Sequence, residues 1–216
     1  MLTLFEELFL LAVHEEKGEV IGAVTRKLHY GLNGAILSEL AFQEKIRIGE
    51  DRRLAISDAV PTGDQVMDAT LERIQSESNE RKVTYWVRKL NDNPKKLRRI
   101  LMERLVEKEL LVEDDSSYSW LIPAPTSPEV QASGKYALKR RLREIALACI
   151  EPEIREVALL GLLRGGSLLN LAFIKDERKL ARQRIYELLI GRALSNAVVS
   201  QVDEICVAVE AAVGAD

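Results

Sequence analysis

The sequence is poor in the residues from which most catalytic and metal centres are built. Its 216 residues include two cysteines, Cys149 and Cys206, and two histidines, His14 and His29. These side chains are far apart in the chain, so the usual zinc-ligand spacing is absent and we expect no metal site. Neither histidine has a nearby serine or cysteine with which to form a nucleophile–base pair, so we expect no catalytic residue, no cofactor and no enzyme activity. Both cysteines lie in apolar helical patterns, which predicts buried free thiols in a reducing cytosol.

Export and membrane-spanning signals are also missing from the sequence. No apolar run approaches the roughly 20 residues that a membrane-spanning helix needs. The first seven residues end in two glutamates and lack the basic region of a secretory signal peptide, which predicts a cytoplasmic protein. With 47% hydrophobic and 30% charged residues, the composition is that of an ordinary folded protein. The length allows one large domain or two small ones.

Charge is distributed in blocks rather than evenly. The net charge is only −3, yet residues 81–108 contain ten Lys or Arg against three Asp or Glu, and residues 135–143 contain five bases and no acid. Residues 109–129 contain five acids and no base. Such blocks are typical either of solvated helix faces or of surfaces that bind a charged partner.

Helical periodicity predominates along the chain, and two short runs predict hairpins. The pattern Thr3-Leu-Phe-Glu6 is a capping box that predicts a helix start. Short strand-like runs flank a glycine-containing loop between residues 45 and 56, and a second pair flanks an acidic loop between residues 109 and 122. We therefore expect a mainly α protein with one or two short β-hairpins. Helices are predicted over 4–16, 32–44, 65–76, 82–90, 94–108, 135–150, 152–164, 167–172, 176–190 and 197–213.

The start of the helix at 94–108 is unusually basic. Lys95, Arg98 and Arg99 are three and four residues apart, so they share one helical face. Cations are unfavourable near the positive end of a helix dipole, which favours a binding role over a merely solvated face. A second group at residues 139–143 is explained by an amphipathic surface helix without any binding role.

The second predicted hairpin carries apolar residues whose role the sequence leaves open. Trp120, Leu121 and Ile122 follow its acidic loop. A projecting hairpin would place Trp120 in a lipid interface, where tryptophan is favoured. The same residues suit contact with another subunit, forming a homo-oligomer, or simple packing in the core.

Six segments, read in order, resemble the Golgi phosphoprotein 3 family of phosphoinositide-binding Golgi adaptors and their prokaryotic relatives. The segments are Leu2–Leu8, Tyr30–Ala41, Pro61–Asp64, Leu105–Lys108, Lys139–Leu142 and Ala181–Ile185. The resemblance implies a single domain over 1–216, with a helical core wrapped by amphipathic helices and a protruding hairpin. It also implies a non-enzymatic peripheral protein on the cytosolic membrane face, with an anionic lipid head group and an unknown protein as partners. Eukaryotic members have a long polar tail before the first helix. This sequence starts directly at the first predicted helix, and in this respect we expect it to resemble the prokaryotic members.

The resemblance also implies where a head group binds. Eukaryotic members bind phosphatidylinositol 4-phosphate with a tryptophan, an arginine and a further pair of basic residues, and these positions fall here on Val24, Asn33, Lys95 and Arg98. Val24 cannot stack on a sugar ring and Asn33 brings no charge, so we expect general binding of anionic lipids. The predicted head-group site consists of Arg98, Lys95, Arg99, Arg26, Asn33 and Val24.

A nucleic-acid-binding protein is the alternative reading. Helix-then-hairpin order occurs at residues 32–56 and again at 95–122, which is also the order in winged-helix modules. The basic block at 81–108 fits that function, whereas the acidic isoelectric point of about 5.7 does not.

Overall fold

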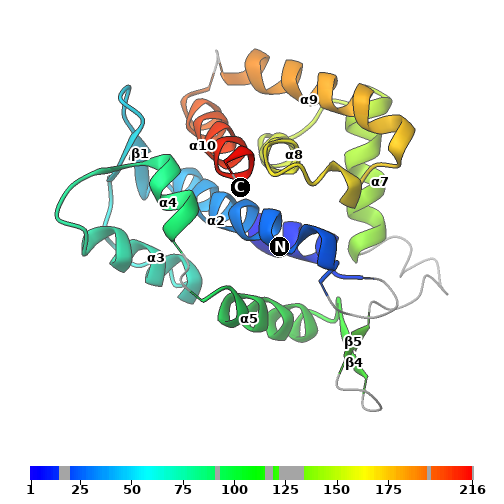
Figure 1. Ribbon diagram of the computed structural model, residues 1–216, viewed down its shortest axis with the longest axis horizontal. Coiled ribbons are helices and arrows are strands. Elements are labelled where there is room, and N and C mark those ends of the chain that lie inside the picture. Colours follow the sequence, from blue (N-terminus) through cyan, green and yellow to red (C-terminus); the bar gives the residue numbers. More distant parts are fainter. Residues whose placement is uncertain (15–19, 91–92, 115–118, 122–133, 194–195, 216) are drawn as a thin grey trace.

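The computed structural model describes residues 1–14, 20–90, 93–114, 119–121, 134–193 and 196–215. Helices account for most of these residues, which confirms the mainly α class (Figure 1). The α-helices are α1 (Leu4–Ala12), α2 (Thr25–Phe42), α3 (Gln65–Gln75), α4 (Val83–Lys89), α5 (Pro94–Glu107), α7 (Gly134–Leu147), α8 (Ile154–Gly165), α9 (Arg178–Ala193) and α10 (Ala197–Gly214). Short 3-10 turns are η1 (Gly22–Val24), η2 (Leu169–Leu171) and η3 (Lys175–Glu177), and the strands are β1 (Ile46–Ile48), β2 (Arg53–Ile56), β3 (Arg81–Lys82), β4 (Val112–Asp114) and β5 (Ser119–Leu121).

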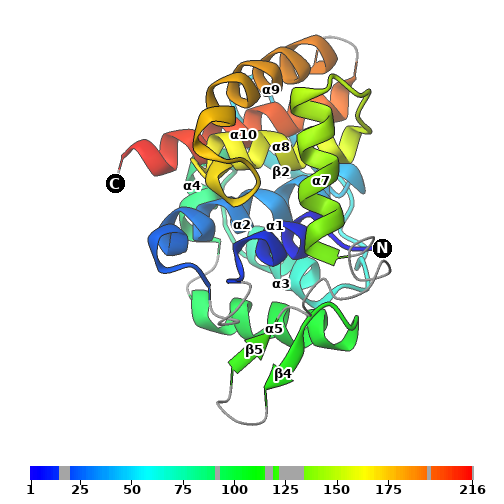
Figure 2. The same cartoon turned by 90° about the vertical axis from the view of Figure 1, so that its right-hand side faces the viewer.

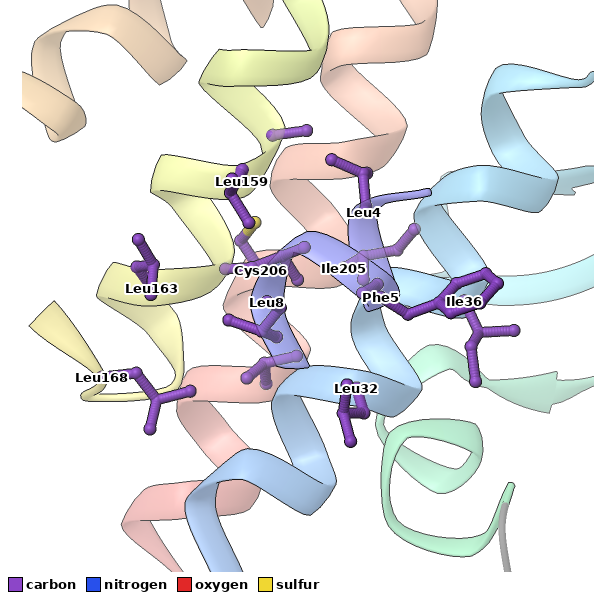
Figure 3. Close-up of a cluster of buried hydrophobic side chains, with 14 of the residues drawn as sticks. Leu4, Phe5, Leu8, Leu32, Ile36, Leu159, Leu163, Leu168, Ile205 and Cys206 are labelled. Atoms are coloured by element: carbon purple, nitrogen blue, oxygen red, sulfur yellow. The ribbon is translucent and has the colours of Figure 1, made fainter. Parts of the chain in front are cut away.

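Helix α2 lies at the centre of the molecule. Helices α1, α4, α8 and α10 all pack against it, and Figures 1 and 2 show it crossing the middle of the fold in both views. One continuous core contains buried side chains from α1 through α10. In Figure 3, Leu8 of α1, Leu32 of α2 and Cys206 of α10 point into this core together with side chains of α8.

Local capping groups fix several helix starts where the sequence predicts them. The Thr3 hydroxyl accepts a hydrogen bond from the Glu6 amide, and the Glu6 carboxylate accepts one from the Thr3 amide, completing the predicted capping box. The Asp64 carboxylate caps α3 by accepting from Val66 and Met67. Asn93 caps α5 by accepting from the Lys96 amide. Each cap satisfies backbone donors that a helix start otherwise leaves without a partner.

Both predicted hairpins are present. Strands β1 and β2 pair antiparallel with Ile46 opposite Ile56, and β3 adds a third strand beside β2. Strands β4 and β5 form the second hairpin, with Glu113 opposite Trp120. The backbones of Trp120 and Leu121 lie in β5, and Ile122 lies outside the described residues. The three roles that the sequence allows for these side chains, contact with lipid, with another subunit or with the core, stay predictions.

The structure differs from the sequence-based expectation in several places. The helix predicted over 167–172 is only the short 3-10 turn η2, and the first helix ends at Ala12 rather than at residue 16. Helix α2 begins at Thr25, seven residues earlier than predicted, so Gly34 lies inside the helix rather than near its start. A Cβ added at Gly34 would lie 2.6 Å from Cγ2 of Val209, so the glycine allows α2 and α10 to approach closely. Cys206 is buried as predicted, but Cys149 is exposed because it follows the end of α7.

The described residues contain neither a membrane-spanning helix nor a cluster of metal ligands. None of the helices combines the length and apolarity needed to span a membrane. Within the same residues, no group of three or more potential ligands is arranged to hold a metal ion.

Candidate anionic-ligand site

The start of α5 presents its basic residues outward because its apolar residues hold the opposite face in the core. Leu97, Leu101 and Leu105 recur every four residues and are buried. Lys95 and Arg99 are exposed on the first two turns. Arg99 lies 3.6 Å from the Glu103 carboxylate, a weak surface pair, whereas Lys95 has no such partner in the described part of the chain.

Arg98 connects this surface to the start of α2. Its Nη2 atom lies 3.5 Å from the main-chain oxygen of Thr25, the first residue of α2, and donates a long hydrogen bond to it. Arg98 is half-buried, and burial lowers the pKa of its guanidinium below the ordinary value. An arginine nonetheless keeps its charge at neutral pH. No carboxylate among the described residues neutralises Arg98, so its positive charge is available to an incoming anion.

His29 lies one turn into α2, close enough to sense the charge of Arg98. Burial, and to a lesser degree the charge of Arg98, lower the pKa of the His29 imidazole. The ring is therefore neutral at neutral pH and adds no charge to the site. Its Nδ1 atom is buried and has no hydrogen-bond partner within the described residues.

The first turn of α2, whose Thr25 carbonyl contacts Arg98, carries two further cations. Arg26 and Lys27 are exposed there, next to Thr25. Val24, which precedes the helix, is 3% exposed and belongs to the core, so it shapes the helix start without contacting solvent. Arg98 follows Arg26 by about 70 residues in the chain, yet it contacts the helix start that carries Arg26.

Asn33 does not lie on this surface. Its side chain is fully buried, and its Nδ2 atom donates a 2.8 Å hydrogen bond to the main-chain oxygen of Val87 in α4. Matching the family pattern position by position placed Asn33 in the site, whereas its observed role is to join α2 to α4. The candidate site therefore excludes Asn33, and Val24 supports it only from the core.

The basic group at residues 139–143 has a structural role instead. Arg141 lies 2.7 Å from Glu156 and Arg143 lies 2.5 Å from Glu177, so these arginines attach α7 to α8 and to η3. This outcome agrees with the amphipathic surface helix that the sequence favours. It distinguishes these paired arginines from Arg98.

Two residues of the site were missed by the sequence-based reasoning. Thr25 and His29 contribute a carbonyl and a buried imidazole next to Arg98. The helix start was predicted seven residues too late, so neither was assigned to a helix, and no local pattern signals their proximity to α5.

These features define a mainly helical protein with a cationic surface formed where two helix starts meet. The chain belongs to the family described as Golgi phosphoprotein 3 (GPP34), whose model matches residues 4–205. It is 29% identical over 161 residues to a vacuolar protein sorting-associated protein 74 of Schizosaccharomyces pombe, covering 65% of this chain and 47% of the relative. The protein of the same name from Eremothecium gossypii is 26% identical over 164 residues, covering 67% of this chain and 49% of the relative. The chain thus aligns with about half the length of the curated relatives it matches.

Proposed function

We propose that this protein is a non-enzymatic peripheral membrane adaptor that binds anionic, phosphoinositide-like lipid head groups on the cytosolic face of a membrane. The binding surface consists of Arg98, Lys95 and Arg99 on α5 together with Arg26 on α2. Membership of the Golgi phosphoprotein 3 family supports a Golgi-type adaptor role, and the names of the two relatives support a link to protein sorting.

The observation that carries this proposal is the state of Arg98. The guanidinium is half-buried and has a carbonyl partner at 3.5 Å but no carboxylate within the described residues. Partial desolvation of an unneutralised charge is unfavourable, and an anion bound there relieves that cost. A guanidinium also binds phosphate through two parallel hydrogen bonds. Arg98 is thus the centre of the site, and the exposed cations around it attract the surface.

Co-sedimentation with vesicles tests the proposal. Neutral phosphatidylcholine vesicles are compared with vesicles containing phosphatidylserine or phosphatidylinositol 4-phosphate, at low and at high salt. We expect binding only to the anionic vesicles, with weakening at high salt because ions screen exposed charges. The variant Lys95→Glu/Arg98→Glu is expected to lose at least about tenfold in affinity, because each basic residue near an anionic surface contributes about 1 kcal/mol.

The matched control reverses two exposed lysines elsewhere. Lys175→Glu/Lys179→Glu makes the same change in net charge on η3 and α9, and its binding should stay within about twofold of wild type. Equal binding by wild type and by Lys95→Glu/Arg98→Glu would show that these two residues do not form the head-group binding surface. Failure of the wild type to bind any anionic vesicle contradicts the function.

The alternative function is that of a winged-helix-like nucleic-acid-binding protein. A helix followed by a hairpin occurs twice, as α2 with β1 and β2 and as α5 with β4 and β5. The same cations would then contact backbone phosphates. A gel-shift titration with random-sequence duplex at low salt separates the two functions, since the adaptor proposal expects no shift at micromolar protein. A hairpin-mediated homo-oligomer and an unidentified protein partner remain further proposals from the family resemblance.

A further inference from the structure

The outer face of α4 carries cations at both of its ends. Lys82, in strand β3 immediately before the helix, and Lys89, the last residue of the helix, lie at opposite ends of α4. Tyr85 lies between them and is exposed. The inner face holds Trp86 and Val87 in the core, which forces the basic residues outward.

These residues border a hollow between α4 and the edge of the three-stranded sheet. Its volume is about 630 Å³. The lining consists of five basic side chains, one tyrosine and one threonine, without a carboxylate: Arg53, Arg81, Lys82, Thr84, Tyr85, Arg88 and Lys89. The hollow shares no residue with the surface at the starts of α2 and α5.

Not all of these charges are neutralised. Arg53 pairs with Asp51 at 3.0 Å, and Arg81 pairs with Glu77 at 2.7 Å while its guanidinium lies 5.3 Å from the ring centre of Tyr85. The remaining three, at positions 82, 88 and 89, have no carboxylate partner within the described residues. Arg88 donates a hydrogen bond to a main-chain oxygen, that of Ala211, at 3.4 Å.

We propose that this hollow binds a small ligand that carries two phosphate groups. A helical rise of 1.5 Å per residue separates Lys82 from Lys89 by about 10 Å along α4, so the cations form two groups rather than one. A single phosphate monoester carries a charge of about −1.5 to −2, which balances only part of three positive charges. Two phosphates joined by a ring match both the charge and the separation, and the exposed Tyr85 lies between the two ends. This inference does not depend on the proposed function, because the two sites are separate.

Isothermal titration calorimetry at low salt tests the inference with a soluble probe. The probe is fructose 1,6-bisphosphate, a sugar with a phosphate at each end, and fructose 6-phosphate is the comparison with one phosphate. We expect the bisphosphate to bind at least about tenfold more tightly, because both groups of cations then form charge-assisted hydrogen bonds. Equal affinity for the two sugars overturns the proposal.

Variants assign the binding to this hollow. Lys82→Gln/Lys89→Gln removes two exposed charges without placing a new carboxylate beside Glu77, so the protein is expected to keep its fold. We expect it to lose at least about tenfold in bisphosphate affinity, whereas Lys175→Gln/Lys179→Gln stays within about twofold of wild type. Unchanged affinity in Lys82→Gln/Lys89→Gln overturns the proposal. A thermal unfolding curve for each variant confirms that folded protein is compared.

Two further arms identify the source of the phosphates. In a Lys95→Glu/Arg98→Glu background, residual binding to vesicles containing phosphatidylinositol 4-phosphate that depends on Lys82 and Lys89 supports a lipid head group. Absence of that residual binding, with bisphosphate binding retained, supports a soluble ligand. A short DNA duplex is tested as a competitor of the bisphosphate. If the duplex binds more tightly per phosphate than the bisphosphate does, and its binding requires Lys82 and Lys89, the proposal is overturned in favour of a nucleic-acid surface.

Discussion

The side-chain amide of Asn33 in α2 donates a 2.8 Å hydrogen bond to the main-chain oxygen of Val87 in α4. Val87 lies in the last turn of α4, where carbonyl groups lack partners within the helix. Asn33 is fully buried, so its amide has no access to a ligand at the surface. The residue that the family pattern places in the head-group site therefore serves here to hold two helices together.

Replacing Asn33 with leucine should destabilise the fold without changing ligand binding. Asn33→Leu keeps the approximate size of the side chain and removes the donor, which leaves the Val87 carbonyl buried without this partner. We expect a loss of about 1–3 kcal/mol in the free energy of unfolding, measured by urea denaturation. Asn79→Leu, at an exposed position before β3, is the control and should change stability little. Loss of vesicle binding at unchanged stability would instead place Asn33 in the binding surface.

The contrast between Asn33 and Lys95 shows what sequence can predict about this site. The shared face of Lys95, Arg98 and Arg99 follows from helical spacing alone, and their helix begins at Pro94 as predicted. The contact of Arg98 with Thr25 depends on how α5 packs near α2, which no local pattern encodes. The burial of Asn33 likewise depends on α4.

The fold shows the same division between local and long-range information. The capping box at Thr3 joins residues only three positions apart, so the sequence predicts it correctly. The caps that Asp64 and Asn93 provide are equally local. The start of α2 was predicted at Leu32 rather than at Thr25, and Gly31 and Gly34 beside it are suited either to a close packing contact or to a tight turn. The structure shows the first of these roles, close packing inside a continuous helix, and the tertiary structure identifies α1, α8 and α10 as the neighbours.

A methyl group at Gly34 should therefore destabilise the core. The added Cβ would lie 2.6 Å from Cγ2 of Val209 and 2.9 Å from Cδ2 of Leu162, and both side chains are buried in the core. We expect Gly34→Ala to cost about 1–3 kcal/mol in unfolding free energy. In Gly34→Ala/Val209→Ala the loss should be smaller than the sum of the single losses, as a double-mutant cycle would measure.

Gly191 provides the matched control for that substitution. It also lies within a helix, α9, but among the described residues no neighbouring atom lies within 4 Å of a Cβ added there. Alanine favours helix more than glycine does, so Gly191→Ala should stabilise the protein by up to about 1 kcal/mol. If both alanine variants changed stability in the same direction, close packing at Gly34 would not be the explanation.

Breaking the ion pair between Glu39 and Arg155 should lower the free energy of unfolding more than breaking a surface ion pair. Arg155 makes two contacts with the Glu39 carboxylate, at 2.5 and 3.0 Å, and the side chain of Glu39 is 4% exposed. Arg155→Met leaves that carboxylate buried without its counter-ion, and we expect a loss of about 3–5 kcal/mol. Arg141→Met breaks the more exposed pair with Glu156 and should cost less than about 1 kcal/mol. If Arg155→Met and Arg141→Met lost similar amounts of unfolding free energy, burial of the Glu39 carboxylate would not determine the strength of its ion pair.

The stability of the protein should fall as the pH rises through neutrality, because of Glu7. Burial raises the pKa of the Glu7 carboxyl to about 7, with Arg155 opposing the shift and Glu39 adding to it. The folded state therefore holds a proton that the unfolded state releases near pH 4.5. Since the folded state binds more protons between these values, the contribution of Glu7 is fully present below pH 4.5 and is lost as the pH rises through about 7.

Replacing Glu7 with glutamine, which stays neutral, should remove that dependence. Between pH 5 and 8 the unfolding free energy of wild type should change more than that of Glu7→Gln. The difference between the two changes should be at most about 3 kcal/mol, and partial solvent access of Glu7 makes it smaller. Above pH 7 the variant should be the more stable protein, and the difference should vanish near pH 4.5. Glu72→Gln, on the exposed face of α3, controls for the loss of one negative charge. A wild-type stability that rises between pH 5 and 8, or parallel profiles for wild type and Glu7→Gln, would show that the Glu7 carboxylate is ionised in the folded protein.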